Sequence, residues 1–493
     1  MHHPIDRIRP QLGRRSRHGI IAALVTVSIA TFAYADSVAT IAETAPPNLQ
    51  PPPITVLQSK AGLERGLVFV APKTTPAPNL QQGPEIIDNQ GRPVWFHPVA
   101  DGNQAADFRV QTYRGESVLT WWEGQSHTGP GHGEGVDYIY DRSYHLIATV
   151  SAGHGYAADT HEFRLTPHGT ALITIYNQVN RDLSSVGGPA NGSVFDGIIQ
   201  EIDVATGAVL FEWHSLDHVG LDESHAPVPT TASTPYDYFH INAVSLDVDG
   251  NLIINSRHTW ALYKVDHHSG HILSRLGGTK TDFALGSNVA FAWQHDPEAV
   301  DDETIRLFDN EASPAVLPAS RVIWIRRDPW RHTATLIRSI VHPDALSAGS
   351  QGNAQALANG DTFVGWGATG RFSEFDREGK LLFDANVPKG WDTYRAYRHA
   401  WHGHPDTQPT ATAQRNSDGT VTVHAIWNGA TDVARWLVIG GSHPRSLWPV
   451  GSGDWNGLDT AITLTTDTHH ISVVAQNADG HLVGRSAPVA VSE

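Results

Sequence analysis

The stretch HINAVSLDVDGNLIINSR, residues 240–257, predicts two β-strands around a tight turn. Apolar and β-branched residues flank a central Asp-Gly-Asn segment that is typical of a turn. A second pair of the same kind, ALYKVDHHSGHILSRL, follows at residues 261–276. Together the two stretches predict a unit of four short antiparallel strands.

The same strand-turn-strand pattern recurs along most of the chain. Further pairs occupy residues 85–98, 106–122 with 138–150, 161–176 with 198–213, 295–311 with 321–340, and 353–367 with 372–385. Repeated units of four short strands are typical of a β-propeller, and a large β-sandwich or solenoid does not require this rhythm. The sequence therefore predicts an all-β protein with a six-bladed β-propeller over residues 61–405.

The pattern changes after about residue 408. Shorter alternating strands, such as VARWLVIGG (433–441) and HHISVVAQN (469–477), are separated by brief turns. Their size and rhythm predict a small immunoglobulin-like or fibronectin-like β-sandwich over residues 408–493.

Residues 1–35 have the features of an export signal. Five arginines precede the apolar run GIIAALVTVSIATFAYA (19–35), which ends in the small-x-small pattern of a cleavage site. A membrane anchor is the alternative, but the run is short for a span. We therefore expect a cleaved signal peptide at 1–35 and a Pro- and Ala-rich linker at 36–60. The mature protein is then secreted, periplasmic or at the cell surface, without a stable membrane span.

Composition narrows the possible functions. The chain has 493 residues and a formal net charge of −17, which disfavours binding to nucleic acid or to anionic membranes. It contains no cysteine, so disulfides, thiolate nucleophiles and Cys-ligated metals are excluded. Neither composition nor pattern indicates an oligomeric state.

Polar residues begin the first strand of four successive units: His161, His240, His295 and Asn353. In a propeller the innermost strand of each blade lines the central channel, so these side chains are expected to face one space. Arg257 ends the hairpin that His240 begins. Such a cluster offers N–H donors to a tetrahedral oxyanion such as sulfate or phosphate.

Two chemistries fit this cluster. A neutral imidazole can attack an activated sulfuryl or phosphoryl group, and a second histidine can act as a base. Alternatively, Asp159-x-His161 and His295-Asp296 could supply metal ligands, because three histidines suit zinc. No HExxH or similarly tight spacing occurs, and both aspartates fit better as turn or strand caps. The residues alone leave an anion site and a metal site open.

The motifs of these units resemble the arylsulfotransferase family. The segments are DTHEF (159–163), HINA (240–243), SRH (256–258) and QHD (294–296). The resemblance runs over most of residues 85–405 and implies a six-bladed propeller. It also implies transfer of a sulfuryl group from a phenolic sulfate ester to a phenol or other hydroxyl. The implied route is ping-pong through a sulfohistidine, with no nucleotide sulfate donor (PAPS), cofactor or metal.

The resemblance also implies roles for five residues. His295 is the expected nucleophile, and His240 with Arg257 holds the sulfuryl oxygens. His161 is expected to act as acid or base. Asn242 is expected to help bind the substrate, because it shares the strand face of His240 and could orient it.

Several other residues near the motifs are not assigned a catalytic role. His258 and Gln294 should alternate away from the motif residues along extended strands. Trp121, Trp122 and Trp293 could stack on aryl rings, although core packing suits them better.

Two other functions remain open from the sequence. One is a non-catalytic propeller that binds anionic or sulfated ligands, and the other is a metal-dependent hydrolase or lyase.

Overall fold

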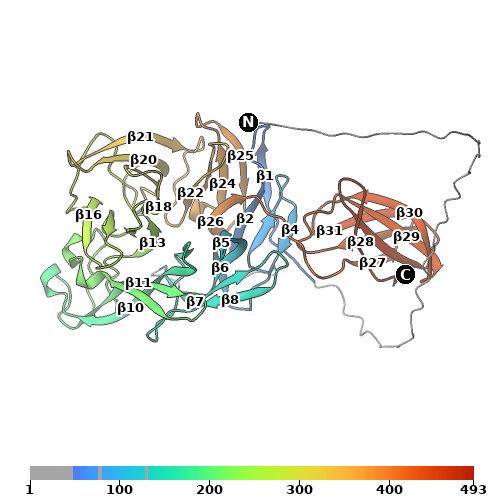
Figure 1. Cartoon of the computed structure of the whole chain (residues 1–493), viewed down its shortest axis with the longest axis horizontal. Coiled ribbons are helices and arrows are strands. Elements are labelled where there is room, and N and C mark those ends of the chain that lie inside the picture. The colour runs from blue at the N-terminus through green and yellow to red at the C-terminus, as the bar shows by residue number, and fades with distance from the viewer. Residues whose placement is uncertain (1–47, 76–79, 128–130) are drawn as a thin grey trace, which may run out of the picture. The chain divides into compact units, whose positions relative to one another are not determined.

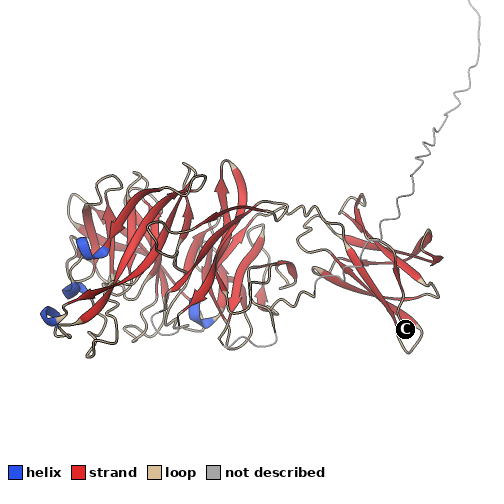
Figure 2. Cartoon of the chain, turned by 90° about the horizontal axis from the view of Figure 1, so that it is seen from below, coloured by secondary structure: helices blue, strands red, loops and turns tan. Residues whose placement is uncertain are grey.

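The computed structural model describes residues 48–75, 80–127 and 131–493. Within these residues the protein consists of β-strands and loops, with four short 3-10 turns (Figure 2). These turns are η1 (Ser184–Val186), η2 (Ser215–Asp217), η3 (Leu221–Glu223) and η4 (Gly367–Thr369). In the described part of the chain, no helix is long and apolar enough to cross a membrane. The predicted all-β class is confirmed, whereas the expected signal peptide lies outside the described residues.

The described strands between residues 55 and 399 form six sheets of four or five strands (Figure 1). The first two contain β5 (Gln104–Tyr113), β6 (Glu116–Ser126), β7 (Gly133–Tyr140) and β8 (Leu146–Val150), then β9 (Phe163–Leu165), β10 (Thr170–Arg181), β11 (Gly192–Asp203) and β12 (Val209–His214). The third contains β13 (Ile241–Leu246), β14 (Leu252–Ser256), β15 (Ala261–Val265) and β16 (Ile272–Gly277). Sequence neighbours pair antiparallel in all three, as the strand-turn-strand pattern predicts.

The other three sheets continue this order. The fourth contains β17 (Ala284–Leu285), β18 (His295–Ala299), β19 (Thr304–Asp309), β20 (Arg321–Asp328) and β21 (Thr333–Val341). The fifth contains β22 (Asn353–Ala356), β23 (Thr362–Gly365), β24 (Arg371–Phe375), β25 (Leu381–Asn386) and β1 (Thr55–Ser59). The sixth contains β26 (Asp392–His399), β2 (Leu67–Lys73), β3 (Glu85–Ile87) and β4 (Pro93–Phe96).

The hairpin predicted at residues 240–257 is the pair β13–β14. Leu246 pairs with Leu252 across the turn. Gly250 adopts a φ of +85°, a left-handed conformation that glycine takes without a steric penalty. Its N–H donates to the carbonyl of Asp247 at 2.9 Å. The predicted hairpin and its turn at Gly250 are therefore confirmed.

The hydrophobic core lies between successive sheets. Ile254 of β14 belongs to a buried cluster with Trp213 of the preceding sheet. Ile253 belongs to a different cluster, with Ile305 of the following sheet. Because successive strand residues point to opposite faces, a single strand closes two neighbouring cores.

Strands from the two ends of this region pair with each other. β2 lies beside β26, and β1 lies beside β25. The second pairing corrects the expected linker at 36–60, because Thr55–Ser59 forms a strand. Val56 packs against the core cluster that includes Phe383. The Pro-rich segment before it concealed this short alternating strand from sequence reasoning.

The C-terminal residues form two further sheets. One contains β27 (Thr410–Arg415), β28 (Thr420–Ile426) and β31 (Asp459–Thr465). The other contains β30 (Ser446–Asp454), β29 (Arg435–His443), β32 (His470–Gln476) and β33 (Leu482–Arg485), with β34 (Val489–Ala490) on β32. Both sheets contribute to one buried cluster around Trp436, Val423 and Val473.

Candidate active site

A cavity of about 940 Å³ lies at the ends of strands from several sheets. Its lining includes His161 from the bend before β9, His240, Arg257 and His258 from the β13–β14 hairpin, and His295 from the start of β18. Four of the five predicted site residues therefore meet at one cavity. The imidazole rings of His161 and His240 are 5.2 Å apart between centroids and nearly perpendicular.

The backbone is left-handed at several positions around this cavity. The φ angles are +48° at His240, +60° at Trp293 and +50° at Asp296. Such conformations are uncommon for residues other than glycine and cost about 1–3 kcal/mol each. Left-handed conformations of this kind persist only where neighbouring residues hold the backbone in place. The hydrogen bonds described below do so around the cavity.

His161 is paired with a buried aspartate. Its Nδ1 and its main-chain N–H both bond to the carboxylate of Asp159. The second carboxylate oxygen accepts the N–H of Gly133 at 2.8 Å. Burial raises the pKa of Asp159, but the contacts with His161 and Gly133 outweigh burial and hold it below its ordinary value. The ionised Asp159 therefore keeps a proton on Nδ1 of His161 and leaves Nε2 for the cavity.

His240 has a matching aspartate partner. Its Nδ1 bonds to Asp237, which lies three residues earlier in the chain. Burial, together with nearby His161 and Arg257, lowers the pKa of His240 well below its ordinary value. The ring is therefore neutral at pH 7, with its proton on Nδ1 and a lone pair on Nε2. Two Asp-oriented imidazoles thus stand next to each other at the cavity.

His258 also lies in the cavity, so the prediction that it points away is wrong. Its ring is 4.5 Å from that of His240, and Nδ1 donates to the carbonyl of Asp237. Strand β14 ends at Ser256, and residues 257–260 form a turn, so strand alternation does not apply. Burial lowers the pKa of His258 to about 3.

Arg257 is held from three sides. One terminal nitrogen donates to Nε2 of His258 and the other to the carbonyl of Gly349, both at 2.9 Å. The guanidinium lies over the ring of Trp293, 4.9 Å from its centroid. Burial lowers the pKa of Arg257 only to about 10, so it remains a cation at pH 7. Two of its five N–H donors are used and the Nε–H is buried, which leaves the second N–H of each terminal nitrogen for an anion.

His295 has a defined tautomer. Its Nδ1 lies 2.7 Å from Oδ1 of Asn310 and 3.1 Å from the carbonyl of Trp293, and both of these atoms are acceptors. The proton is therefore on Nδ1, and Nε2 holds the lone pair that a nucleophile needs. That lone pair accepts the N–H of Gln351 at 3.1 Å. Burial and then Arg257 lower the pKa of His295 well below its ordinary value, so the ring is neutral.

Asn242 does not line the cavity, contrary to the predicted contact with substrate. It is fully buried, and its amide nitrogen donates to the carbonyl of Gln294 at 2.9 Å. Asn255 donates to the same carbonyl at 2.8 Å and also to the side-chain oxygen of Asn242. The register of β13 shifts between Ile241 and Ala243, which takes Asn242 out of the face of His240. Asn242 therefore supports the backbone just before His295.

Asn353 is the second residue that does not reach the common space. Its side chain bonds to both the N–H and the carbonyl of Ala396. Gln294, as predicted, points away from the cavity and bonds to Asn255 at 2.7 Å. Trp121 and Trp122 are buried in the core, which confirms packing as their role.

Sequence reasoning missed three residues of the site: Asp237, Asn310 and His258. Asp237 had the clearest signal, because it precedes His240 by three residues in DYFH. Asn310 had no local signal, since it lies fifteen residues after His295 and reaches it across the β18–β19 pair.

Asp237, His240 and His258 could hold a metal ion. One ligand atom from each lies within 4.8 Å of the others. However, the Arg257 guanidinium contacts His258 at 2.9 Å, so a metal ion there would lie beside a fixed cation. Asp296, proposed from sequence as a ligand beside His295, instead faces the buried Arg395 at 3.7 Å.

The chain is similar to several solved structures, whereas no curated protein matches it. Among solved structures it is similar to a protein of unknown function from Bacteroides caccae, with 12% identity, a TM-score of 0.42 and coverage of 68% of this chain and 99% of that one. It is similar to a protein from Lactobacillus plantarum, with 13% identity, a TM-score of 0.36 and coverage of 87% and 97%.

A third similar structure is a virginiamycin B lyase from Staphylococcus aureus, with 9% identity, a TM-score of 0.34 and coverage of 76% and 96%. The family model described as arylsulfotransferase (ASST) matches residues 109–387, which is more than half of the chain. This match spans the DTHEF, HINA, SRH and QHD motifs and all four side chains that meet at the cavity. The protein therefore belongs to the arylsulfotransferase (ASST) family.

Proposed function

We propose that this protein is an exported aryl-sulfate sulfotransferase that moves a sulfuryl group from a phenolic sulfate ester to a phenol or another hydroxyl. The observation that carries the proposal is the meeting of His161, His240, Arg257 and His295 at one cavity. Family membership supports aryl sulfates and phenols as the substrates. No nucleotide donor and no cofactor is required in this scheme.

His295 is the proposed nucleophile. Its neutral Nε2 attacks sulfur, and the bond from sulfur to the phenolic oxygen breaks, which leaves a sulfohistidine. The Nδ1 proton held by Asn310 and the Trp293 carbonyl keeps the lone pair on Nε2. Attack requires the Gln351 N–H to release this lone pair.

Charge on the sulfuryl oxygens is stabilised by Arg257. Its guanidinium is largely buried, and electrostatic stabilisation of a transition state is strong where water has little access. His240 is neutral in the empty cavity, but an anionic sulfuryl group next to it favours protonation of its Nε2. The resulting N–H then donates to the sulfuryl oxygens, while Asp237 faces the imidazolium, as in a catalytic triad.

His161 is the proposed acid and base. As an imidazolium it gives its Nε2 proton to the departing phenolate. The neutral ring then takes the proton of the acceptor hydroxyl, which attacks sulfur and releases His295. Asp159 holds the ring in one orientation through both halves of the reaction.

We also propose a six-bladed propeller, a C-terminal sandwich and a signal peptide for this chain. Six sheets in chain order, with β26 paired to β2, suit a six-bladed propeller closed by strands from its two ends. The two C-terminal sheets around one core suit an immunoglobulin-like sandwich at 408–493. We assign residues 1–35 to a signal peptide and the mature protein to the periplasm, cell surface or exterior.

Two other functions each have one supporting observation. The hydrogen bond between Gln351 and His295 favours a binding protein, because it occupies the nucleophilic lone pair. The spacing of Asp237, His240 and His258 favours a metal-dependent hydrolase or lyase.

Turnover of p-nitrophenyl sulfate in the presence of phenol tests the proposal. We expect release of nitrophenol and formation of phenyl sulfate by the metal-free protein, and loss of both in His295→Ala. His214→Ala is the matched control, because His214, like His295, has its Nδ1 2.7 Å from a side-chain oxygen, but it lies outside the cavity lining. Tight binding of the ester without turnover would favour the binding protein, and activity that depends on added metal would favour the hydrolase.

A further inference from the structure

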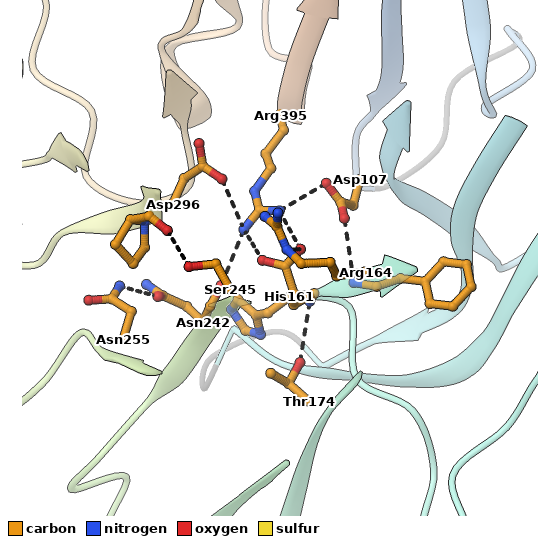
Figure 3. A network of polar contacts seen from close by, with 12 residues as sticks. Asp107, His161, Arg164, Thr174, Asn242, Ser245, Asn255, Asp296 and Arg395 are labelled. Atoms are coloured by element: carbon orange, nitrogen blue, oxygen red, sulfur yellow. Dashed lines mark hydrogen bonds and ion pairs between the residues drawn. The ribbon is translucent and has the colours of Figure 1, made fainter. Parts of the chain in front are cut away.

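A buried ionic network lies next to His161, one of the residues that line the cavity (Figure 3). Its central residue is Arg395 of β26, whose side chain is fully buried. The carboxylates of Asp107, Glu162 and Asp296 surround its guanidinium. None of these four residues lines the cavity, so the network lies outside the site described above.

Two of the carboxylates directly follow the site histidines in the chain. Glu162 follows His161 and binds Arg395 at two points, with distances of 3.2 and 3.0 Å. Asp296 follows His295 and lies 3.7 Å from the same guanidinium. Two of the cavity histidines, His161 and His295, are therefore each joined by one peptide bond to a residue whose carboxylate contacts Arg395.

The contact with Arg395 holds Asp296 where the backbone departs from a regular strand. This residue has a left-handed φ of +50°, and the register of β18 shifts between His295 and Glu298. The second oxygen of Asp296 accepts the N–H of Ala354 at 3.0 Å. The carboxylate is thus held from two directions, which fixes the peptide that carries His295.

Arg395 and the residue after it contact all five other sheets of residues 55–399. Arg395 reaches Asp107 on β5 at 3.0 Å, Glu162 before β9, the carbonyl of Asn242 on β13 at 3.5 Å, and Asp296 on β18. Ala396 exchanges two hydrogen bonds with Asn353 on β22. One point on β26 therefore sets the mutual position of the strands that carry the histidines.

The charges of this network depend on one another. Burial raises the pKa of Glu162, but Arg395, Arg164 and Arg109 outweigh burial and lower it to about 2. Glu162 is therefore ionised at pH 7. A lysine in place of Arg395 would keep one positive charge, but it lacks the planar fork that binds several carboxylates at once.

We infer that Arg395 is a positioning residue of the reaction, which sets His161 and His295 relative to each other through Glu162 and Asp296. This inference rests on the proposed function of the two histidines. A small misplacement of reacting groups can lower a rate by about 100-fold. Arg395 does not itself line the cavity, so its effect on the rate is indirect. Its guanidinium also lies 5.2 Å from the ring centroid of Tyr394, a lining residue whose ring is 5.6 Å from that of His161.

The test compares Arg395→Lys with Arg398→Lys. Arg398 lies three residues later on β26, is equally buried, and pairs with Glu374 at 2.6 Å, with no contact to a residue beside a site histidine. We expect Arg395→Lys to lower kcat for p-nitrophenyl sulfate by about 10–100-fold with little change in KM. Arg398→Lys should keep the kcat of the wild type.

A second readout separates positioning from general stability. Nitrogen NMR of the histidine rings, assigned with single His→Gln variants, should show that Arg395→Lys moves the signals of both His161 and His295. Glu162→Gln should move only His161, and Asp296→Asn only His295. These two variants keep the shape of each side chain and provide the test if Arg395→Lys does not fold.

The outcomes are distinct. Wild-type kcat in Arg395→Lys, an equal loss in Arg398→Lys, or unmoved His161 and His295 signals would overturn the inference. If the wild-type protein releases no nitrophenol, the proposed function fails, and the ring signals still decide whether Arg395 positions the two histidines.

Discussion

The two sides of the strands that carry the site histidines differ in how their polar groups are held. On the cavity side, His161 and His240 each contact one aspartate and keep one ring nitrogen for a substrate. On the inner side, Glu162 contacts both Arg109 and Arg395 and is fully buried. The imidazole rings proposed to act on the substrate thus make few hydrogen bonds, whereas the carboxylate that holds the backbone makes several ion pairs. At His161 and Glu162, chemistry and rigidity are thus assigned to two successive residues of the chain.

We expect the largest loss of activity when a carboxylate on the cavity side is replaced. Asp159→Asn and Asp237→Asn keep the side-chain shape but lose the charge that fixes the tautomer of the paired histidine. We expect kcat for aryl sulfate turnover to fall by about 10²–10⁴-fold in each. Steady-state kinetics with p-nitrophenyl sulfate and phenol measures the change.

Asp196→Asn is the control for both variants. Asp196 bonds to His214 at 2.7 Å in a similar pair that lies outside the cavity lining. It should keep wild-type kcat. Equal losses in all three variants would mean that the charge of Asp159 and Asp237 serves folding rather than turnover.

Arg257 offers the next largest effect. Arg257→Lys keeps a positive charge but cannot bond to His258 and Gly349 while also donating to a sulfuryl group. We expect kcat/KM for the sulfate ester to fall by about 100-fold, because stabilisation of the transition-state oxyanion is lost.

Arg338→Lys is the matched control for Arg257→Lys. Arg338 lies 4.6 Å over the ring of Trp324, a similar cation–π contact, and lies outside the cavity lining. Its substitution should leave kcat/KM unchanged. A wild-type value in Arg257→Lys would contradict a role for the guanidinium fork.

The pH dependence of the first half-reaction should be shifted towards acid. Burial and then Arg257 lower the pKa of His295, so its neutral, nucleophilic form persists below its ordinary pKa of 6.5. A free histidine would lose about three quarters of this form at pH 6. We expect no decrease in kcat/KM for the donor as the pH is lowered from 7.5 to 6 and a decrease only at lower pH, with the protein still folded by circular dichroism. A fall centred near pH 6.5 would contradict the neutral nucleophile.

The smallest expected effect is a change in the free energy of unfolding, caused by the buried carboxylate of Asp137. Asp137 is fully buried, and neither carboxylate oxygen has a hydrogen-bond partner among the described residues. Burial, and then Asp107, Asp159 and Glu162, raise its pKa well above the ordinary value. A raised folded-state pKa gives stability that is present in acid and lost as pH rises through that pKa.

Asp137→Asn should therefore stabilise the protein at neutral or alkaline pH, by about 1–3 kcal/mol. The gain should shrink in acid, where the carboxyl group is protonated. Urea unfolding of both proteins at pH 4.5 and pH 8 measures the difference. A loss of stability at pH 8 would indicate that the carboxylate is stabilised in the fold.

Much of the fold could be predicted because its signals are local. The β13–β14 hairpin follows from an alternating pattern around Gly250, and the same pattern locates the other strand pairs. β1 was missed because its five residues follow a proline-rich segment and pair with β25, more than 300 residues away. Pairing partners at that distance leave no mark on local pattern.

The candidate site could be predicted only in part, for similar reasons. His161, His240 and His295 stand in repeated positions, and Arg257 ends the hairpin that His240 begins, so the repeat and the hairpin bring the four together. Asn242 was misplaced because a register shift in β13 breaks strict alternation. Arg395 gave no signal at all, because its carboxylate partners come from other sheets.

Intact mass of the protein after brief mixing with p-nitrophenyl sulfate, without acceptor, tests the central claim most directly. We predict that one sulfuryl group is added to the wild-type chain, that fragmentation places it on His295, and that added phenol removes it. His295→Ala should gain no such mass. Release of nitrophenol by a wild-type protein that never carries the sulfuryl group, or by His295→Ala at the wild-type rate, would contradict the account.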